Sequence, residues 1–374
     1  MAFSKAAGDS SRFFTVFALI FALLCTLFVQ VGCTSDSGTR PVAPVPTEFP
    51  SSESPEITPT ACFDETSATY ELFYFENRRL EQCVREQLGW EGKIFLGDIL
   101  SVTVLDLSHC GINDISELAA FQNLVELNLS FNAVQSLEPL MQLKELRRLT
   151  LNNVSTADFS VLSRLTQLRE LSLRQCGISD LSPLSALSAL QTLDIGNNAA
   201  TSLEPVSMLV QLTNLYADNN AITDILPICG LNSLETLSLH NNGIVSIESI
   251  FQLTKLRYLD LGRNGITDIV PLCKLKRLQT LDLSFNAVES CNVPLESAAL
   301  QNLNLSSNGL TDISALLLKT TDLRRLTLTN NPINDFSLLF GMKKLRFISA
   351  VEGTGMSSET LIALQLALPN ADFE

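Results

Sequence analysis

The sequence predicts an α/β repeat solenoid: an arc with a parallel concave β-sheet, a convex side of short 3₁₀ turns, and a helical cap at each end. Two observations predict this fold class. First, an asparagine follows a run of leucines in most of a long series of repeats. Second, the leucine pattern returns in register at 22 residues or a multiple of it, with first leucines that include Leu124, Leu190, Leu212, Leu234, Leu256 and Leu278.

The leucine pattern itself reads as a β-strand. In the repeat that begins at Leu124, Leu127 and Leu129 alternate with a polar residue, as in a strand with one buried face. Equivalent strands of successive repeats should pair in parallel at about 4.8 Å. The frame gives eleven repeats over residues 101–344, and a further strand begins the terminal segment 345–374.

The asparagine position should be buried, and its amide should bond backbone groups of its own and the neighbouring turn, because buried polar groups need partners. In three repeats the position holds Cys110, Val154 and Cys176, and we interpret the two cysteines as core thiols. The other eight repeats hold Asn132, Asn198, Asn220, Asn242, Asn264, Asn286, Asn308 and Asn331.

The second half of each repeat predicts a turn and not a full helix. A short side chain able to cap the first amides of a helical turn recurs there. A proline three residues later, present in five repeats, favours a short 3₁₀ or polyproline-like wall. The capping residues are Asp114, Asp158, Asp180, Asp224, Asp268, Asp312 and Asp335, with Ser136, Ser202, Ser246 and Ser290 in the other repeats.

Both ends of the array carry helical signals, as a solenoid with an exposed terminal core requires. Within segment 62–100, apolar residues recur four positions apart over residues 76–88, which predicts an amphipathic helix, and residues 93–96 read as a short strand. Residues 359–368 read as a C-terminal capping helix.

The repeat LxxLxLxxN-x-I-x-D-I-x-P-L resembles the 22-residue leucine-rich repeats of bacterial internalins and of the related phosphatase-regulator class. The N-terminal helix is similar to the cap of internalin-like proteins. This resemblance implies a leucine-rich-repeat horseshoe that binds another molecule. It does not identify the ligand, because the repeat frame records packing.

Residues 1–32 read as an export signal. Lys5 and Arg12 precede an apolar run of nineteen residues, 13–31, and polarity begins directly after Cys33. The Val-Gly-Cys motif that ends at Cys33 resembles the bacterial lipobox, which implies cleavage before Cys33 and lipidation of that cysteine. The alternative is an uncleaved anchor, because the run comes near the length that spans a bilayer.

Residues 33–61 are predicted to be a disordered linker that begins with the lipidated cysteine. Prolines recur there among serine, threonine and glutamate, a composition typical of a semi-extended spacer. A signal, a spacer and a solenoid in that order predict a membrane-anchored lipoprotein at the bacterial cell envelope, on the outer membrane or the cell surface.

The cysteines and the charge narrow the classes of function. Cys62 and Cys83 flank the N-terminal cap, and in an exported protein they can form a disulfide; two separate buried thiols are an equal alternative. The nine cysteines include no CxxC pair, which argues against a zinc site. A net charge of −15 argues against nucleic acid as a partner.

The candidate ligand-binding surface is the concave sheet of repeats six to nine. Aromatic residues and arginine among small polar residues are typical of protein-binding surfaces. The alternative is an ordinary solvated surface, with the contacts elsewhere. The predicted ligand-binding residues are Tyr216, Asp218, His240, Tyr258, Asp260, Arg263, Asp282 and Phe285.

One group of residues on this surface suggests a metal site and another suggests a catalytic triad, and neither group is complete. Asp260 and Asp282 supply few oxygens for calcium, which takes six to eight. Ser238, His240 and Asp218 resemble a hydrolase triad, but no Gly-rich elbow or oxyanion-forming turn lies nearby in the sequence. We therefore expect no enzyme, no catalytic residue, no metal and no cofactor.

Three functions are compatible with these patterns. The first is an exported, lipid-anchored protein that binds a protein or glycan on its concave face. The second is a structural envelope protein whose solenoid packs against other copies or cell-wall material. The third is an intracellular regulator of the phosphatase-associated type, which the repeat class alone suggests.

Overall fold

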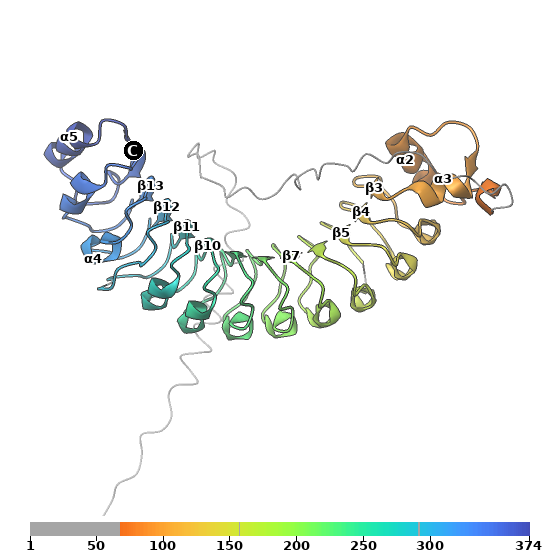
Figure 1. The fold of residues 1–374 in the computed structure, drawn as a ribbon, viewed down its shortest axis with the longest axis horizontal. Coiled ribbons are helices and arrows are strands. Elements are labelled where there is room, and N and C mark those ends of the chain that lie inside the picture. The colour runs from red at the N-terminus through yellow and green to blue at the C-terminus, as the bar shows by residue number, and fades with distance from the viewer. Residues whose placement is uncertain (1–67, 157, 291) are drawn as a thin grey trace, which may run out of the picture. The chain divides into compact units, whose positions relative to one another are not determined.

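The computed structural model describes residues 68–156, 158–290 and 292–374. The signal segment, Cys33, the linker and Cys62 lie outside the described residues. The described residues belong to one compact unit, Glu65–Glu374. Figure 1 shows this unit as an arc with strands on its inner side and short helical turns on its outer side, which confirms the predicted fold class.

The described strands include thirteen that form one parallel sheet in chain order. The central leucine or isoleucine of the three-residue strands is buried, because it packs into the core, and the residues beside it point to the inner face. Strands β3 to β13 correspond to the eleven predicted repeats, and β14 to the further strand. The sheet consists of β3 (Val104–Asp106), β4 (Glu126–Asn128), β5 (Arg148–Thr150), β6 (Glu170–Ser172), β7 (Thr192–Asp194), β8 (Asn214–Tyr216), β9 (Thr236–Ser238), β10 (Tyr258–Asp260), β11 (Thr280–Asp282), β12 (Asn302–Asn304), β13 (Arg325–Thr327), β14 (Phe347–Ser349) and β15 (Asp372–Phe373).

The outer side consists mainly of 3₁₀ turns, as the capping residues and prolines predict. Asp180 shows the capping: its Oδ1 accepts the backbone N–H of Ser182 at 2.8 Å. All five recurrent prolines lie in the first turn of their element. These elements are η2 (Ser116–Ala120), η3 (Glu138–Gln142), η4 (Ser160–Arg164), η5 (Ser182–Ala186), η6 (Glu204–Val206), η7 (Leu226–Ile228), η8 (Glu248–Gln252), η9 (Val270–Lys274), η10 (Ser337–Gly341) and one short α-helix, α4 (Ser314–Leu317).

Each of the eight asparagines joins its repeat to the one before it, as predicted. The buried Asn242 donates from Nδ2 to the carbonyls of Leu239 and His240 in its own repeat, and to Ala217 in the preceding repeat. Its Oδ1 accepts the N–H of Ile222 at 3.0 Å. A single side chain thus satisfies four backbone groups across a repeat boundary.

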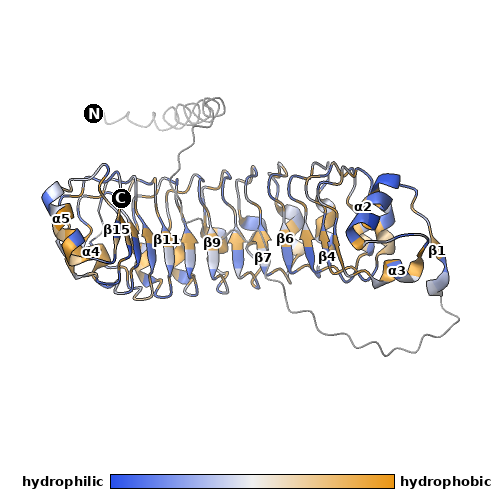
Figure 2. Cartoon of the chain, turned by 90° about the horizontal axis from the view of Figure 1, so that it is seen from above, coloured by the Kyte–Doolittle hydropathy of each residue, from blue (hydrophilic) through white to orange (hydrophobic). Residues whose placement is uncertain are grey.

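The N-terminal cap contains the predicted helix, α2 (Arg78–Leu88), and the predicted short strand, β2 (Ile94–Phe95). Helix α2 begins at residue 78 because the side chain of Asn77 accepts two of its first amides, and it ends at Gly89, which has a φ of 66°. Figure 2 draws α2 largely in the hydrophilic colour, consistent with one buried face. The sequence pattern does not predict η1 (Ala68–Tyr70), β1 (Leu72–Phe73), which pairs antiparallel with β2, or α3 (Leu96–Ser101).

The C-terminal cap contains α5 (Ser358–Ala367), close to the predicted helix. The hydroxyl of Ser357 accepts the N–H of Thr360, which fixes the start of α5. Beyond α5 the chain adds β15 to the sheet beside β14, an element that the leucine pattern does not predict. Of the helices that the structure describes, none has the length and apolar character needed to cross a membrane.

Candidate functional site

The candidate site lies on the inner face, at the last residue of five neighbouring strands. Parallel pairing places Asp194, Tyr216, Ser238, Asp260 and Asp282 side by side in that order. We call these five residues the concave row. The row brings together three predicted ligand-binding residues, Tyr216, Asp260 and Asp282, and adds Asp194.

A second set of side chains lies two residues after each strand and leans over the concave row. Arg174 is its most connected member. Its guanidinium donates to Oδ1 of Asp194 at 2.9 Å and forms a two-pronged pair with Asp218 at 3.0 and 2.8 Å. The three side chains are only 22%, 15% and 16% exposed, so the pairing is largely desolvated. Asp218 is therefore already occupied by a residue of its own chain.

A glycine makes this long reach feasible. Gly196 lies between Arg174 and Asp218, and a Cβ at Gly196 would come within 2.4 Å of the Arg174 guanidinium. The absence of a side chain there lets Arg174 contact Asp218, which lies two repeats further along the chain. Burial still raises the pKa of Asp194, although Arg174 opposes this shift.

The same arrangement returns three repeats later with histidine in place of arginine. Nδ1 of His240 lies 3.2 Å from Oδ1 of Asp260. Gly262 again provides the space, since a Cβ there would lie 2.7 Å from Nδ1 of His240. The position equivalent to Asp218 is now Ser284 and the position equivalent to Tyr216 is Asp282, so this half keeps two acids but has histidine where the other has arginine.

Asp282 has hydrogen-bond donors but no basic partner of its own in the described structure. It accepts the N–H and hydroxyl of Ser284 at 2.8 and 2.6 Å, and the amide of Asn304 at 2.9 Å. Burial, and then the adjacent charge of Asp260, raise the pKa of Asp282. Burial also raises the pKa of Tyr258, and the carboxylates of Asp260 and Asp282 add to that shift. Two tyrosines and two carboxylates thus share one partly desolvated stretch of β8 to β11.

The last two predicted residues form the rim of this surface. The Arg263 guanidinium lies 4.4 Å from the centre of the Phe285 ring, a cation–π contact. Both residues have a left-handed backbone, with φ values of 55° and 54°, which is unusual for bulky side chains. The Phe285 side chain stays 46% exposed.

The geometry does not assemble a hydrolase triad. His240 turns Nδ1 toward Asp260, and Asp218 is bound by Arg174, so Asp218 does not orient His240. Residues 68–156, 158–290 and 292–374 contain no group of three or more histidine, cysteine, aspartate or glutamate side chains placed to hold a metal ion. What the surface offers is a row of hydrogen-bonding, aromatic and charged contacts.

Comparison with known proteins agrees with this architecture. A family model described as leucine-rich repeats (2 copies) matches residues 101–140, 166–207, 210–252 and 254–295. No curated protein sequence matches the chain. Together with the 13-stranded parallel sheet of the described residues, the matched model settles the fold. The fold is a leucine-rich-repeat solenoid.

Solved leucine-rich-repeat structures resemble it over most of its length. An internalin (inlF) from Listeria monocytogenes is 26% identical, with a TM-score of 0.69 over 80% of this chain and 95% of the other. Internalin C2 from the same organism is 28% identical, with a TM-score of 0.54 over 56% of this chain and 94% of the other. The ectodomain of the plant receptor kinase GASSHO1/SCHENGEN3 from Arabidopsis thaliana, in complex with CASPARIAN STRIP INTEGRITY FACTOR 2, is 21% identical, with a TM-score of 0.60 over 73% of this chain and 38% of the other.

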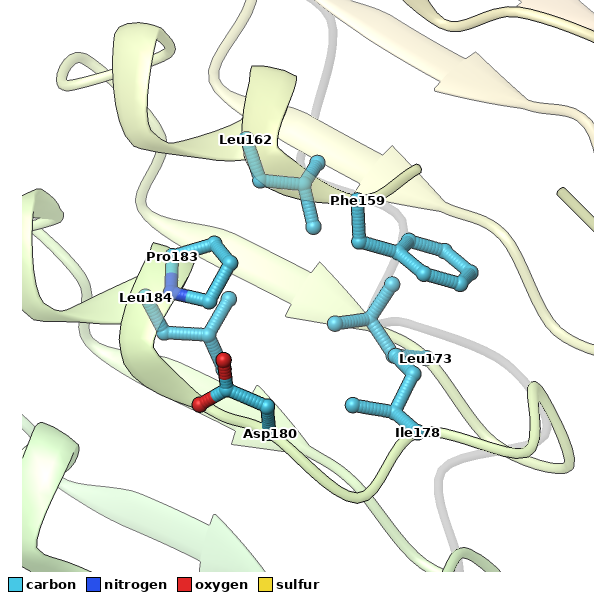
Figure 3. Close-up of a pocket in the computed structure, with 7 residues that line it drawn as sticks. All are labelled: Phe159, Leu162, Leu173, Ile178, Asp180, Pro183 and Leu184. Carbon is cyan, nitrogen blue, oxygen red and sulfur yellow. The ribbon is translucent and has the colours of Figure 1, made fainter. Parts of the chain in front are cut away.

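A small hollow lies between η4 and η5 on the outer face of the leucine-rich repeats, and it is too small for a ligand. Figure 3 shows its lining, which is apolar apart from Asp180 at one edge. The space is too small to admit a water molecule. We interpret it as a packing gap. The lining residues are Phe159, Leu162, Leu173, Ile178, Asp180, Pro183 and Leu184.

Sequence reasoning missed Arg174, Asp194 and Gly196 as parts of the site. Arg174 stands outside repeats six to nine, and the pattern of a single strand does not reveal that Asp218 is already paired. A signal was present: Arg174, Gly196 and Asp218 recur at the same phase of three successive repeats. Comparison of this position between successive repeats shows an arginine, then a glycine without a side chain, then an aspartate.

Proposed function

We propose that this chain is an exported, lipid-anchored binding protein that holds a protein ligand on the concave face of its leucine-rich repeats. The observation that carries the proposal is the stretch formed by Tyr216, Tyr258, Asp260 and Asp282. Its aromatic rings provide contact area, and within the described part of the chain its carboxylates have donors but no arginine or lysine partner. Such a surface favours a basic segment of a partner protein.

The comparisons support a binding role at a coarser level. The plant ectodomain of the same fold is in complex with a factor. The internalins share the fold of this chain at higher identity. Export and lipid anchoring rest on residues 1–33 of the sequence, where a basic start and an apolar run end at Cys33.

The export part of the proposal is tested on the mature N-terminus. We expect mass spectrometry of the membrane-extracted protein to show a chain that starts at Cys33 and carries acyl groups. Cys33→Ser should abolish acylation, while Cys25→Ser, a cysteine inside the apolar run, should leave it unchanged. A cytoplasmic protein that retains Met1 would contradict export and would favour an intracellular regulator.

The binding part is tested by photocrosslinking in intact cells. A benzophenone residue in place of Tyr258, on β10, should capture a discrete partner. The matched control replaces Phe251, an accessible aromatic residue of η8 on the outer face that is 46% exposed. Because only the inner face carries the proposed contacts, we expect adducts from position 258 and not from position 251.

The identity of the adduct separates the competing functions. A protein adduct whose yield falls with Asp260→Arg supports the proposal, since that change reverses the charge that a basic segment would contact. An adduct with a second copy of this chain would favour a structural envelope role. Adducts from position 251 alone would place the binding surface on the outer face and contradict the proposal.

A further inference from the structure

Two cysteines meet where the N-terminal cap packs on the first repeat. Cys83 lies on α2 and is 4% exposed; Cys110 lies in the turn after β3. The Cys83 thiol approaches the carbonyl of Cys110, with Sγ and O 3.8 Å apart. Nε of Arg79, one turn earlier on α2, donates to the same carbonyl. Helix α2 therefore contacts this turn through two side chains, Arg79 and Cys83, and these contacts keep the two cysteines close together.

The two cysteines are close neighbours, since Sγ of Cys83 lies 3.8 Å from the backbone oxygen of Cys110. Burial and a hydrogen bond with the Cys83 thiol together raise the pKa of Cys110 to about 12. Both cysteines are free thiols in this structure, and a disulfide requires their sulfur atoms to approach to about 2.05 Å.

The position of Cys110 in the repeat explains why a cysteine stands there. It occupies the asparagine position, where Asn132 in the next repeat bonds the carbonyl of Leu107 and the N–H of Ile112 in the repeat before it. In the described part of the chain, no repeat precedes the one that holds Cys110; helix α2 of the cap packs there instead, and it does not offer the backbone groups of a repeat turn. An asparagine at position 110 would lose these cross-repeat partners, whereas a thiol can use Cys83 as its partner.

Cys176 provides an internal comparison. It occupies the same position of a later repeat, but its Sγ donates to the carbonyl of Leu151 at 3.0 Å. That carbonyl lies 25 residues back, the separation over which Asn132 bonds Leu107. Cys176 thus replaces part of the asparagine's bonding within the repeat array. Cys110 instead lies next to Cys83 across the boundary between cap and array.

We propose that Cys83 and Cys110 form a disulfide that fastens the N-terminal cap to the first repeat. The inference rests on the proposed export, because the bond requires an oxidising compartment. The two thiols lose two protons and form one sulfur–sulfur bond, and their two electrons reduce the disulfide of a thiol–disulfide exchange protein to a dithiol. A protonated, buried thiol is a poor nucleophile, so the bond forms during folding, before α2 closes over the repeat.

This bridge excludes the pairing of Cys83 with Cys62, because Cys83 can form one disulfide bond.

The bridge would also hold the N-terminal cap on the first repeat. The cap covers the end of the core, and terminal units of a solenoid are held by one neighbour only. A covalent link between α2 and the turn after β3 prevents the cap from opening without the array.

The test uses the full chain in mild detergent, reduced, unfolded and refolded in a mixture of reduced and oxidised glutathione. We expect digestion without reductant to yield a peptide pair joined through Cys83 and Cys110, lighter by two hydrogens than the separate peptides. Cys62→Ser should retain this pair, and Cys110→Ser should lose it. Reduction should lower the Tm by roughly 5 °C in the wild type and the Cys176→Ser control, but not in Cys110→Ser.

Two results would overturn the inference: a Cys62–Cys83 pair, or both Cys83 and Cys110 recovered with free thiols after refolding. Because glutathione replaces the cellular oxidant, the outcome does not depend on export. The mature N-terminus tests export separately, so the failure of one proposal can be distinguished from the failure of the other.

Discussion

Replacing Asn242 by leucine is expected to reduce the free energy of unfolding by about 4 kcal/mol. Leucine has a similar volume but cannot bond the four backbone groups that the amide satisfies. Each buried group left without a partner costs roughly 1–3 kcal/mol, and partial access of water limits the sum. Urea unfolding followed by circular dichroism measures the change.

Asn241 provides the matched control because it precedes Asn242 but points to solvent. Its backbone has a φ of 53° and its side chain bonds that of Asn219. Asn241→Gly keeps the left-handed backbone accessible and should change stability by less than about 1 kcal/mol. An equal loss in both variants would show that the asparagine position is not a specific structural requirement.

Replacing Arg174 by methionine is expected to destabilise the protein by about 3 kcal/mol at pH 7, because Asp194 and Asp218 would remain partly buried without their cation. Methionine retains much of the side-chain volume. Asp194→Asn combined with Asp218→Asn in the same variant should restore most of the loss, since neutral amides do not need the cation.

The loss in Arg174→Met should grow with pH. Burial already raises the pKa of Asp194 in the folded state, and removal of Arg174 would raise it further. A carboxyl whose folded pKa exceeds its unfolded value binds more protons when folded, so its contribution to stability falls as pH rises through that interval. The difference from the wild type should therefore be small near pH 4 and reach its full size above the raised pKa. A difference independent of pH would contradict the charge explanation.

Gly196→Ala tests the same cluster without removing a charge. The added Cβ would overlap the Arg174 guanidinium, so the bridge to Asp218 should break at a cost of about 1–3 kcal/mol. Gly230→Ala is the control, because nothing lies within 4 Å of a Cβ at that glycine. Urea unfolding of the two variants side by side measures the difference.

The fold could be predicted from the sequence because packing repeats every 22 residues. The leucines fill the core, the asparagines bond backbone groups of adjacent turns, and the capping aspartates bond the first amides of the outer turns. The structure places all three types of residue where these roles require. The caps were only partly predictable, since β1, α3 and β15 carry too few residues for a periodic signal. Their positions depend on contacts with the array.

The candidate site was less accessible to sequence reasoning. Tyr216, Asp260 and Asp282 could be aligned because strand register follows from the repeat. The partner of Asp218 could not, because it depends on how far Arg174 extends over Gly196. Side-chain reach across two repeats is a property of three-dimensional packing, and no periodic pattern encodes it.

The asparagine bonds join a repeat only to its neighbour, and this has a consequence for how such a chain can change over generations. Gain or loss of one whole 22-residue unit preserves the strand register and the asparagine bonds of the units that remain. The bridge from Arg174 to Asp218 spans three consecutive units, so a duplication or deletion within them would separate the charges. We expect the length of the array to vary outside residues 174–218, and variation inside that segment to proceed by single substitutions.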